Sequence, residues 1–446
     1  MEADLDWKRL FRNFDYLMFF TAIGLTIFGI MFIYSANLNK QAYLRTEYLK
    51  QILFAIICIL MFFGILFLKP SQISSFTFYF YVVCLIGLML TLLFPSVKGQ
   101  RRFTIMGFSI QFSDFLKIAT VLFLSKFYAA HQNEVQSLKV YCKAGLIALV
   151  AVGAVIIQPD LGSALVFIPI FFGISFAAGV KVRYLLYTFG LFVAVSFVPL
   201  VTTLNSLFFN NESEIVYLIM NYKYIIIIAL FFVVTITLCV LAYFDVIKGI
   251  SVNFKPVFYW YVFFTSFIFV GLMFSYPANK FLKQYQKDRL LIFFNPHADP
   301  LNTGYNIIQS MTAIGNGGVS GKGWQQGEMT QNKFLPEQAT DFIFPVIAEE
   351  AGYIGSLLLL FLYGLYFFRG FSIAYKAKDL WSTYVCVGLL CMILFHILEN
   401  MGMAMGIMPI TGIPLPFISY GGSFLIACYL STGLMMNIKL NRISPY

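Results

Sequence analysis

Long apolar runs recur along the chain and are separated by short polar segments. A run of about 20 apolar residues is long enough to cross a bilayer as a helix. Twelve such runs are present, at about 15–36, 49–69, 75–95, 112–130, 141–158, 161–180, 184–203, 223–244, 257–276, 342–368, 382–402 and 417–437. The pattern predicts an all-α polytopic membrane protein with about twelve transmembrane helices.

The composition supports the same fold class. Hydrophobic residues make up 60% of the 446 residues and charged residues only 11%, whereas soluble domains carry about 25% charged residues. The mean hydropathy is +0.82. In hydrocarbon each span must satisfy its own backbone hydrogen bonds, so we expect helices.

The net charge of +10 could indicate nucleic acid binding, but cytoplasmic loops of membrane proteins are basic, and we predict no nucleic acid partner.

Lys and Arg in the short loops favour an N-terminus in the cytoplasm, and an even number of spans returns the C-terminus there. No small-residue cleavage site follows the N-terminal segment, so the first span is predicted to be uncleaved. The seven cysteines lie in or beside apolar runs without CxxC spacing, which predicts neither a disulfide framework nor a metal site.

Residues 277–341 form the longest polar segment and are predicted to be a long extracytoplasmic loop. The stretch GNGGVSGKGW (315–324) indicates tight backbone turns. Apolar residues between Tyr305 and Ile314 recur with a helical period. We therefore expect a re-entrant or interfacial helix within this loop.

The loop runs into the stretch FLPEQATDFIFPVIAEE (334–350), where Asp341 directly precedes an apolar span. An ionisable group beside hydrocarbon is costly and tends to be functional. The alternative is that Thr340 or Asp341 caps the helix. Position alone leaves the two interpretations equal.

Other unusual polar residues fall at the same, outer side in this topology. Asp114 and Lys117 share a helix face, although they could form only a mutual ion pair. Asp160 could be a helix cap, and His396 could make only a helix–helix hydrogen bond. The whole set is Arg101, Arg102, Asp114, Lys117, Asp160, Asp341, Glu349, Glu350, His396, Glu399, Asn400 and the segment 409–423.

Such a set suits a ligand that is anionic, polar and lipid-anchored. A transporter would place its charges near the midplane, often at broken helices. Most of the charges here lie at span ends, which favours an enzyme acting on a lipid-linked substrate.

At these residues the chain resembles the SEDS family (shape, elongation, division, sporulation), in its rod-shape branch. The matching motifs are Gly99–Phe103, Gln111–Lys117, Gln158–Gly162, Gly321–Trp324, Leu335–Phe344 and Asn400–Ser423. The chain departs from the family pattern at Phe103, Asp114, Ala339 and Phe424. The family has ten spans, so residues 223–276 look like an additional hairpin within a single SEDS-type domain, 1–446.

The resemblance implies a peptidoglycan glycosyltransferase that polymerises lipid II on the outer face of the bacterial cytoplasmic membrane. It implies a class B penicillin-binding protein as transpeptidase partner within the elongation machinery. The family's essential acid maps to Asp341. The residues expected to bind substrate are Arg102, Lys117, Asp160, Asp114, Glu337, Glu350, Ser419 and Ser423.

No cofactor is certain. A divalent cation, Mg²⁺ or Mn²⁺, could assist at the pyrophosphate, but the sequence shows no ligand set for it. The alternative functions are a lipid II flippase or transporter and a non-catalytic scaffold for a transpeptidase.

Overall fold

The computed structural model of the chain describes residues 13–38, 46–93, 103–105, 108–208, 222–243, 255–282, 284–298 and 303–442. The chain divides into two compact units. One comprises Met1–Val180 with Asn306–Tyr446, and the other Lys181–Tyr305.

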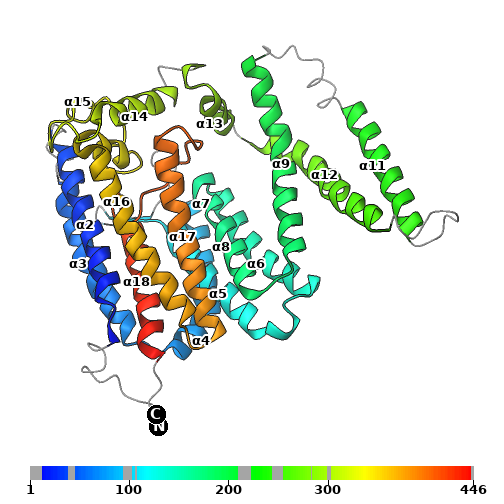
Figure 1. Ribbon diagram of the computed structural model, residues 1–446, viewed down its shortest axis with the longest axis horizontal. Helices are drawn as coiled ribbons and strands as arrows, with labels where there is room; N and C mark the ends of the chain where they lie inside the picture. Colours follow the sequence, from blue (N-terminus) through cyan, green and yellow to red (C-terminus); the bar gives the residue numbers. More distant parts are fainter. Residues whose placement is uncertain are drawn as a thin grey trace, which may run out of the picture. The chain divides into compact units, whose positions relative to one another are not determined.

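The described part of the chain is helical (Figure 1). It also contains a short hairpin of strands. The hairpin pairs β1 (Phe103–Ile105) with β2 (Phe108–Ile110) in antiparallel register. In chain order the α-helices are α2 (Tyr16–Asn37), α3 (Glu47–Leu66), α4 (Pro70–Leu90), α5 (Phe112–Ala130), α6 (Leu138–Ile157), α7 (Leu161–Leu165), α8 (Phe167–Ala178), α9 (Val182–Phe208), α11 (Tyr222–Tyr243), α12 (Lys255–Phe281), α13 (Gln284–Phe294), α14 (Thr303–Gly317), α15 (Glu328–Gln331), α16 (Ile343–Tyr375), α17 (Leu380–Ala404) and α18 (Gly422–Asn441). The 3₁₀ turns are η1 (Thr91–Leu93), η2 (Gln132–Glu134) and η4 (Pro296–Ala298).

Each of the twelve predicted spans contains a helix. Among the described residues, ten helices are long and apolar enough to cross a membrane. Helix α5 falls outside that set and carries Asp114, Lys117 and Lys126, while α11 is apolar over the shorter stretch Ala229–Leu241. The all-α multi-pass fold is confirmed.

The predicted span 161–180 is confirmed as one apolar span, Leu161–Ala178. It is interrupted at Val166 between α7 and α8, because Pro169 has no amide hydrogen to donate to the carbonyl of Leu165. One predicted boundary is wrong. The last span begins at Gly422 and not at residue 417. Phe417 has a positive φ of 64°, which an L residue adopts outside a helix.

The predicted loop 277–341 is largely helical. Helix α12 continues to Phe281, and α13, α14 and α15 follow it. The apolar period between Tyr305 and Ile314 corresponds to α14, so the helix expected within the loop is present.

Helix α18 lies at the centre of the larger unit. It packs on α3 and also contacts α5, α16 and α17. Its polar side chains bond to neighbouring helices. Thr432 Oγ1 lies 2.9 Å from Tyr366 Oη, and Asn437 donates to the carbonyl of Ile65 at 2.8 Å. Buried polar groups in such a position need partners, and these contacts fix α18 among its neighbours.

Helix α16 is broken at Gly352, whose φ of 66° and ψ of −162° are not helical. The glycine-rich segment after α14 lies against this break. The amides of Lys322 and Gly323 donate to the carbonyls of Glu349 and Glu350 at 2.9 and 3.0 Å, and the amide of Tyr353 donates to Gly318 at 2.9 Å. The backbone groups freed by the kink are therefore satisfied by this segment, as membrane burial requires.

In the smaller unit, α12 packs on α9 and on α11. Small residues let α9 and α12 approach closely, since a Cβ built on Gly271 would lie 2.2 Å from the Cβ of Ala194. Close contact through small residues is a general mode of helix association in membranes.

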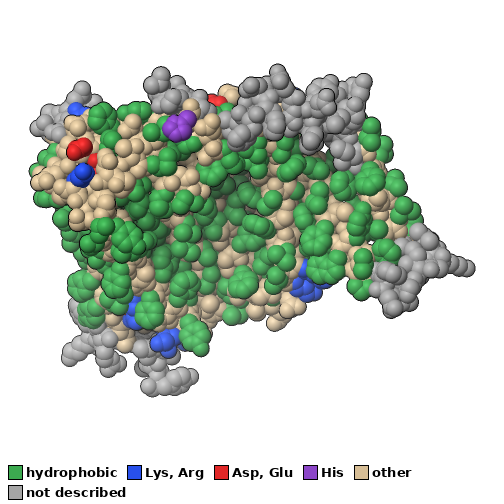
Figure 2. Space-filling model, turned by 45° about the horizontal axis from the view of Figure 1, so that its top comes forward, with side chains coloured by type: hydrophobic (Ala, Val, Ile, Leu, Met, Phe, Trp, Pro, Cys, Tyr) green, Lys and Arg blue, Asp and Glu red, His purple; other side chains and the backbone are tan. Residues whose placement is uncertain are grey.

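Large hydrophobic side chains cover the outer surfaces of the helices (Figure 2). Leu60, Phe76, Phe176 and Phe368 are each at least 66% exposed. Apolar surface on this scale would be a liability in water and is explained by contact with lipid. The chain is a multi-pass membrane protein.

Candidate active site

A buried ion pair lies near the start of α5. Lys117 Nζ is 3.1 Å from Asp114 Oδ1, and the two side chains are 1% and 5% exposed. Ser423, in the first turn of α18, donates to Asp114 Oδ2 at 3.1 Å. Two charges at this depth persist only as a well-bonded pair. Asp114 and Lys117, three residues apart on α5, therefore form the mutual ion pair that was one of the two interpretations of their spacing.

His396 of α17 extends this cluster. Its Nε2 lies 3.3 Å from Lys117 Nζ and its Nδ1 3.3 Å from the carbonyl oxygen of Pro414. Because an ammonium can only donate, Nε2 is the acceptor and the Nδ1 hydrogen faces Pro414. The Phe424 ring lies 4.5 Å from the imidazole. The cluster thus joins α5, α17, α18 and the loop 405–421.

Asp341 lies in a turn that leads into α16. The amides of Thr340 and Phe342 donate to the carbonyl of Glu337 at 3.2 and 3.3 Å. The chain is therefore already turning before the helix begins at Ile343, and its N-cap is Phe342. The interpretation of Thr340 or Asp341 as the helix cap is wrong. The Asp341 side chain is half-buried.

Asn400 of α17 and Gly412 of the loop 405–421 lie on either side of the contact that positions Asp341. Asn400, near the end of α17, donates from Nδ2 to the carbonyl oxygens of Asp341 and Ile413, both at 2.8 Å. Gly412 faces the carboxylate, because a Cβ built on it would lie 3.1 Å from Asp341 Oδ2. The main chain of Asp341 is tied to α17, and its carboxylate lies against the loop 405–421.

A second pair of contacts binds the preceding residues to the same loop. Ser419 Oγ donates to the carbonyl of Thr340 at 2.6 Å and accepts from the Leu415 amide at 2.8 Å. The Tyr420 amide donates to the carbonyl of Ala339 at 2.7 Å. Burial, with the nearby charge of Glu47, raises the pKa of Tyr420, so its phenol stays neutral.

Asp160 lies at the start of α7, which packs on this loop. Its Oδ1 accepts from the Ser163 amide at 3.0 Å, which is the predicted helix cap, and its Oδ2 accepts from Gln111 Nε2 at 2.8 Å. Gly162 lies against the loop, since its Cβ would be 2.7 Å from the carbonyl oxygen of Thr411. The start of α7 therefore packs against Thr411, which directly precedes Gly412.

The remaining predicted residues have different surroundings. Glu337 is exposed, and Thr340 Oγ1 lies 3.4 Å from its Oε2. Glu350 is buried and accepts from Ser35 Oγ at 2.5 Å and Gln331 Nε2 at 3.3 Å, contacts that hold α2 and α15 to α16. Arg102, with Arg101, lies outside the described residues.

Sequence reasoning did not single out Gln51, which shapes this site. It named Asn400 and the segment that contains Gly412, but not their contacts with Asp341. Gln51, fully buried in α3, donates to the carbonyl of Ser419 at 3.2 Å and accepts from the Gly421 amide at 3.3 Å. An uncharged polar residue within an apolar span was the available signal for Gln51 and Asn400.

The model of the FtsW/RodA/SpoVE family, described as cell cycle protein, matches residues 15–223 and 204–443. Peptidoglycan glycosyltransferase RodA of Treponema pallidum (strain Nichols) is 36% identical over 440 residues, which cover 97% of this chain and 98% of that protein. Peptidoglycan glycosyltransferase MrdB of Escherichia coli (strain K12) is 45% identical over 161 residues, 36% of this chain and 44% of that protein.

Solved structures share the fold. A chain from work described as structural coordination of polymerization and crosslinking by a peptidoglycan synthase complex is 24% identical, with a TM-score of 0.65, covering 97% of this chain and 99% of that one. The crystal structure of the rod shape determining protein RodA of Thermus thermophilus is 21% identical, with a TM-score of 0.59, covering 97% and 98%.

Proposed function

The chain belongs to the FtsW/RodA/SpoVE family, and on that premise we propose that it is a peptidoglycan glycosyltransferase that polymerises lipid II. The observation that carries the proposal is the setting of Asp341. Its carboxylate is half-buried, its main chain is fixed by Asn400, and Gly412 leaves room beside it. A relative over nearly the whole chain length bears the name of this activity.

In the proposed reaction the 4-hydroxyl of the acceptor sugar attacks the anomeric carbon of the donor. A new glycosidic bond forms, and the bond to undecaprenyl pyrophosphate breaks. Asp341 takes the proton of the attacking hydroxyl as general base. A general base must be held in the correct orientation toward the hydroxyl, because orientation contributes much of the rate enhancement. The hydrogen bond from Asn400 to the main chain of Asp341 provides part of this constraint.

The leaving group needs charge neutralisation more than a proton, in contrast to the two-carboxylate glycosidases. We assign the pyrophosphate contact to Arg102 on the strength of the family motif. Lys117 forms an ion pair with Asp114 and a hydrogen bond with His396. We therefore propose that this buried cluster positions α17 and the loop 405–421. We assign Asp160 to holding the start of α7, which packs on this loop through Gly162, and Ser419 to tying the loop to Thr340. Exposed Glu337 is kept as a candidate contact to sugar hydroxyls.

A divalent cation at the pyrophosphate is proposed from the sequence alone. The described residues contain no group of three or more His, Cys, Asp or Glu side chains that could hold a metal ion. The residues described around Asp341 do not form a ligand set, and no step of the proposed reaction is routed through a metal.

We further propose that Asp341 faces the outside of the cytoplasmic membrane. Arg369, Lys376, Lys439 and Arg442 gather at the far ends of α16 and α18. Arg369 follows the break at Gly352 by 17 positions on α16, about 25 Å of continuous helix, and Asp341 lies beyond that break, so the basic end and Asp341 lie toward opposite ends of α16. Basic residues favour the cytoplasmic side, so we assign the end of α18 and the start of α2, where Asp15 meets Arg369 and Lys439, to the cytoplasm and Asp341 to the outside.

We propose a class B penicillin-binding protein of the elongation machinery as partner. The likeness in fold to a chain studied in a peptidoglycan synthase complex supports this assignment, together with the family membership. Such a partner would cross-link the strands that this chain makes.

The test is the product made from labelled lipid II by the purified chain in proteoliposomes, with and without the partner. We expect glycan polymers from the wild type and from Glu134→Gln, which removes an exposed carboxylate in η2, and at least about 100-fold slower polymer formation from Asp341→Asn. Lipid II translocation without polymer would indicate the transporter instead. Equal polymer from folded Asp341→Asn would refute the role of that acid.

A further inference from the structure

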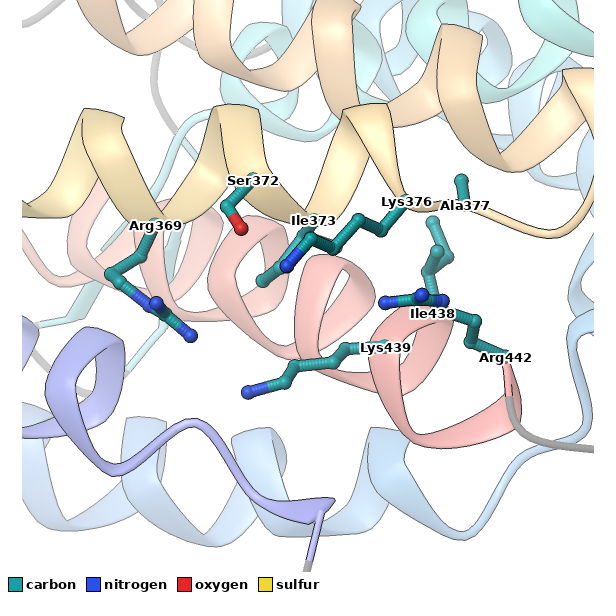
Figure 3. Close-up of a pocket in the computed structure, with 8 residues that line it drawn as sticks. All are labelled: Arg369, Ser372, Ile373, Lys376, Ala377, Ile438, Lys439 and Arg442. Atoms are coloured by element: carbon teal, nitrogen blue, oxygen red, sulfur yellow. The ribbon is translucent and has the colours of Figure 1, made fainter.

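A basic cavity lies between the ends of α16 and α18. It is lined by Arg369, Ser372, Ile373, Lys376, Ala377, Ile438, Lys439 and Arg442 and has a volume of about 70 Å³. That is several times the space needed for one water molecule, so a phosphate-sized group fits. In Figure 3 the charged ends of Lys376 and Arg442 lie in the space between the two helices.

The charges around this cavity do not cancel. Asp15 accepts from Arg369 at 2.7 Å and from Lys439 at 2.8 Å, so one carboxylate serves two cations. Within the described residues, neither Lys376 nor Arg442 has an ion-pair partner, and both are exposed. Where the structure describes this end of the chain, the four cations that line the cavity and Asp15 sum to a charge of +3.

Two simpler explanations account for part of this pattern. Cations near a helix C-terminus complement its dipole, and basic residues collect on the cytoplasmic side. Neither requires four cations from two helices to converge on one cavity with an available hydroxyl, Ser372. Apolar Ile373 and Ile438, each 4% exposed, form its inner wall, as suits the apolar part of a lipid beside a charged headgroup.

We propose that this cavity binds the phosphate of an anionic phospholipid. It lies at the end of membrane-spanning helices, where headgroup phosphates are found, and basic pockets between transmembrane helices are known to take such groups. Lys376 and Arg442 supply the free charge, and Ser372 supplies a hydrogen-bond donor. Arg369 and Lys439 are held in place by Asp15.

Native mass spectrometry of the full chain, titrated with phosphatidylglycerol or phosphatidylcholine, tests the proposal. We expect the wild type to bind the first phosphatidylglycerol more tightly than phosphatidylcholine. Each basic residue near an anionic lipid surface is worth about fivefold. The double variant Lys376→Gln/Arg442→Gln should therefore bind phosphatidylglycerol roughly 25-fold more weakly, with its phosphatidylcholine binding unchanged.

Two controls keep the result interpretable. Lys378→Gln removes an exposed cation close in sequence that does not line the cavity, and it should retain wild-type preference. The swap variant Lys376→Arg/Arg442→Lys keeps both positive charges. It should bind phosphatidylglycerol as the wild type does, in contrast to Lys376→Gln/Arg442→Gln. Equal affinity for the two lipids in the wild type, or an equal loss in Lys378→Gln, would overturn the proposal. Displacement of the lipid by glycerol 3-phosphate at equal concentration would overturn the lipid assignment in favour of a soluble phosphate.

Discussion

Gly412→Ala should slow polymerisation by displacing the Asp341 carboxylate. The new Cβ would lie 3.1 Å from Asp341 Oδ2, a few tenths of an ångström inside ordinary contact, so the carboxylate must move. A misplacement of about 1 Å can cost on the order of 100-fold in rate. A smaller shift should cost roughly tenfold in kcat, equivalent to about 1.4 kcal/mol, with little change in the KM for lipid II.

The substitution also strains the backbone, because Gly412 has a φ of 73° and an L residue there costs about 1–2 kcal/mol. Gly406→Ala separates the two effects. Gly406 lies in the same loop with a φ of 72°, but its Cβ would meet the flexible Met311 side chain and not Asp341. Initial rates of lipid II polymerisation and thermal unfolding midpoints are measured for both variants. Equal losses of activity would refute the reasoning.

Two further perturbations test the charged groups. Lys117→Met should destabilise the chain by about 3–5 kcal/mol because Asp114 is left buried and unpaired, and Lys117→Met/Asp114→Asn should recover most of this in thermal unfolding; no recovery would contradict the pairing. Burial alone would raise the pKa of Asp15, but hydrogen bonds from Arg369, Lys439 and the Met18 amide hold it below its usual 3.8. This carboxylate therefore contributes stability above about pH 4 that is lost as the pH falls through its folded pKa, so unfolding midpoints of the wild type should fall over that range more steeply than those of Asp15→Asn.

The helices could be predicted because lipid imposes simple rules on sequence. An apolar run of sufficient length must be helical to satisfy its backbone, and each of the twelve runs contains a helix. Local polar contacts were also accessible. Asp160 caps α7, and the spacing of Asp114 and Lys117 gives an ion pair, since both depend on residues close in sequence.

Contacts between segments distant in the chain could not be predicted from the sequence. The cap interpretation of Asp341 failed because residues 337–342 already form a turn, which moves the helix start to Ile343. The bridge from Asn400 to Asp341 joins residues 59 positions apart. The break of α16 at Gly352 depends on the segment 318–323 packing against it. No local pattern encodes these pairings.

The role of Asp341 as general base is tested most directly by measuring lipid II affinity and turnover on the same preparations of wild type and Asp341→Asn. A general base typically contributes about 10²–10⁴-fold in rate. We therefore predict that Asp341→Asn binds lipid II within a few-fold of the wild type while kcat falls by at least about 100-fold. A kcat near that of the wild type, or a loss confined to lipid II affinity, would contradict the assignment.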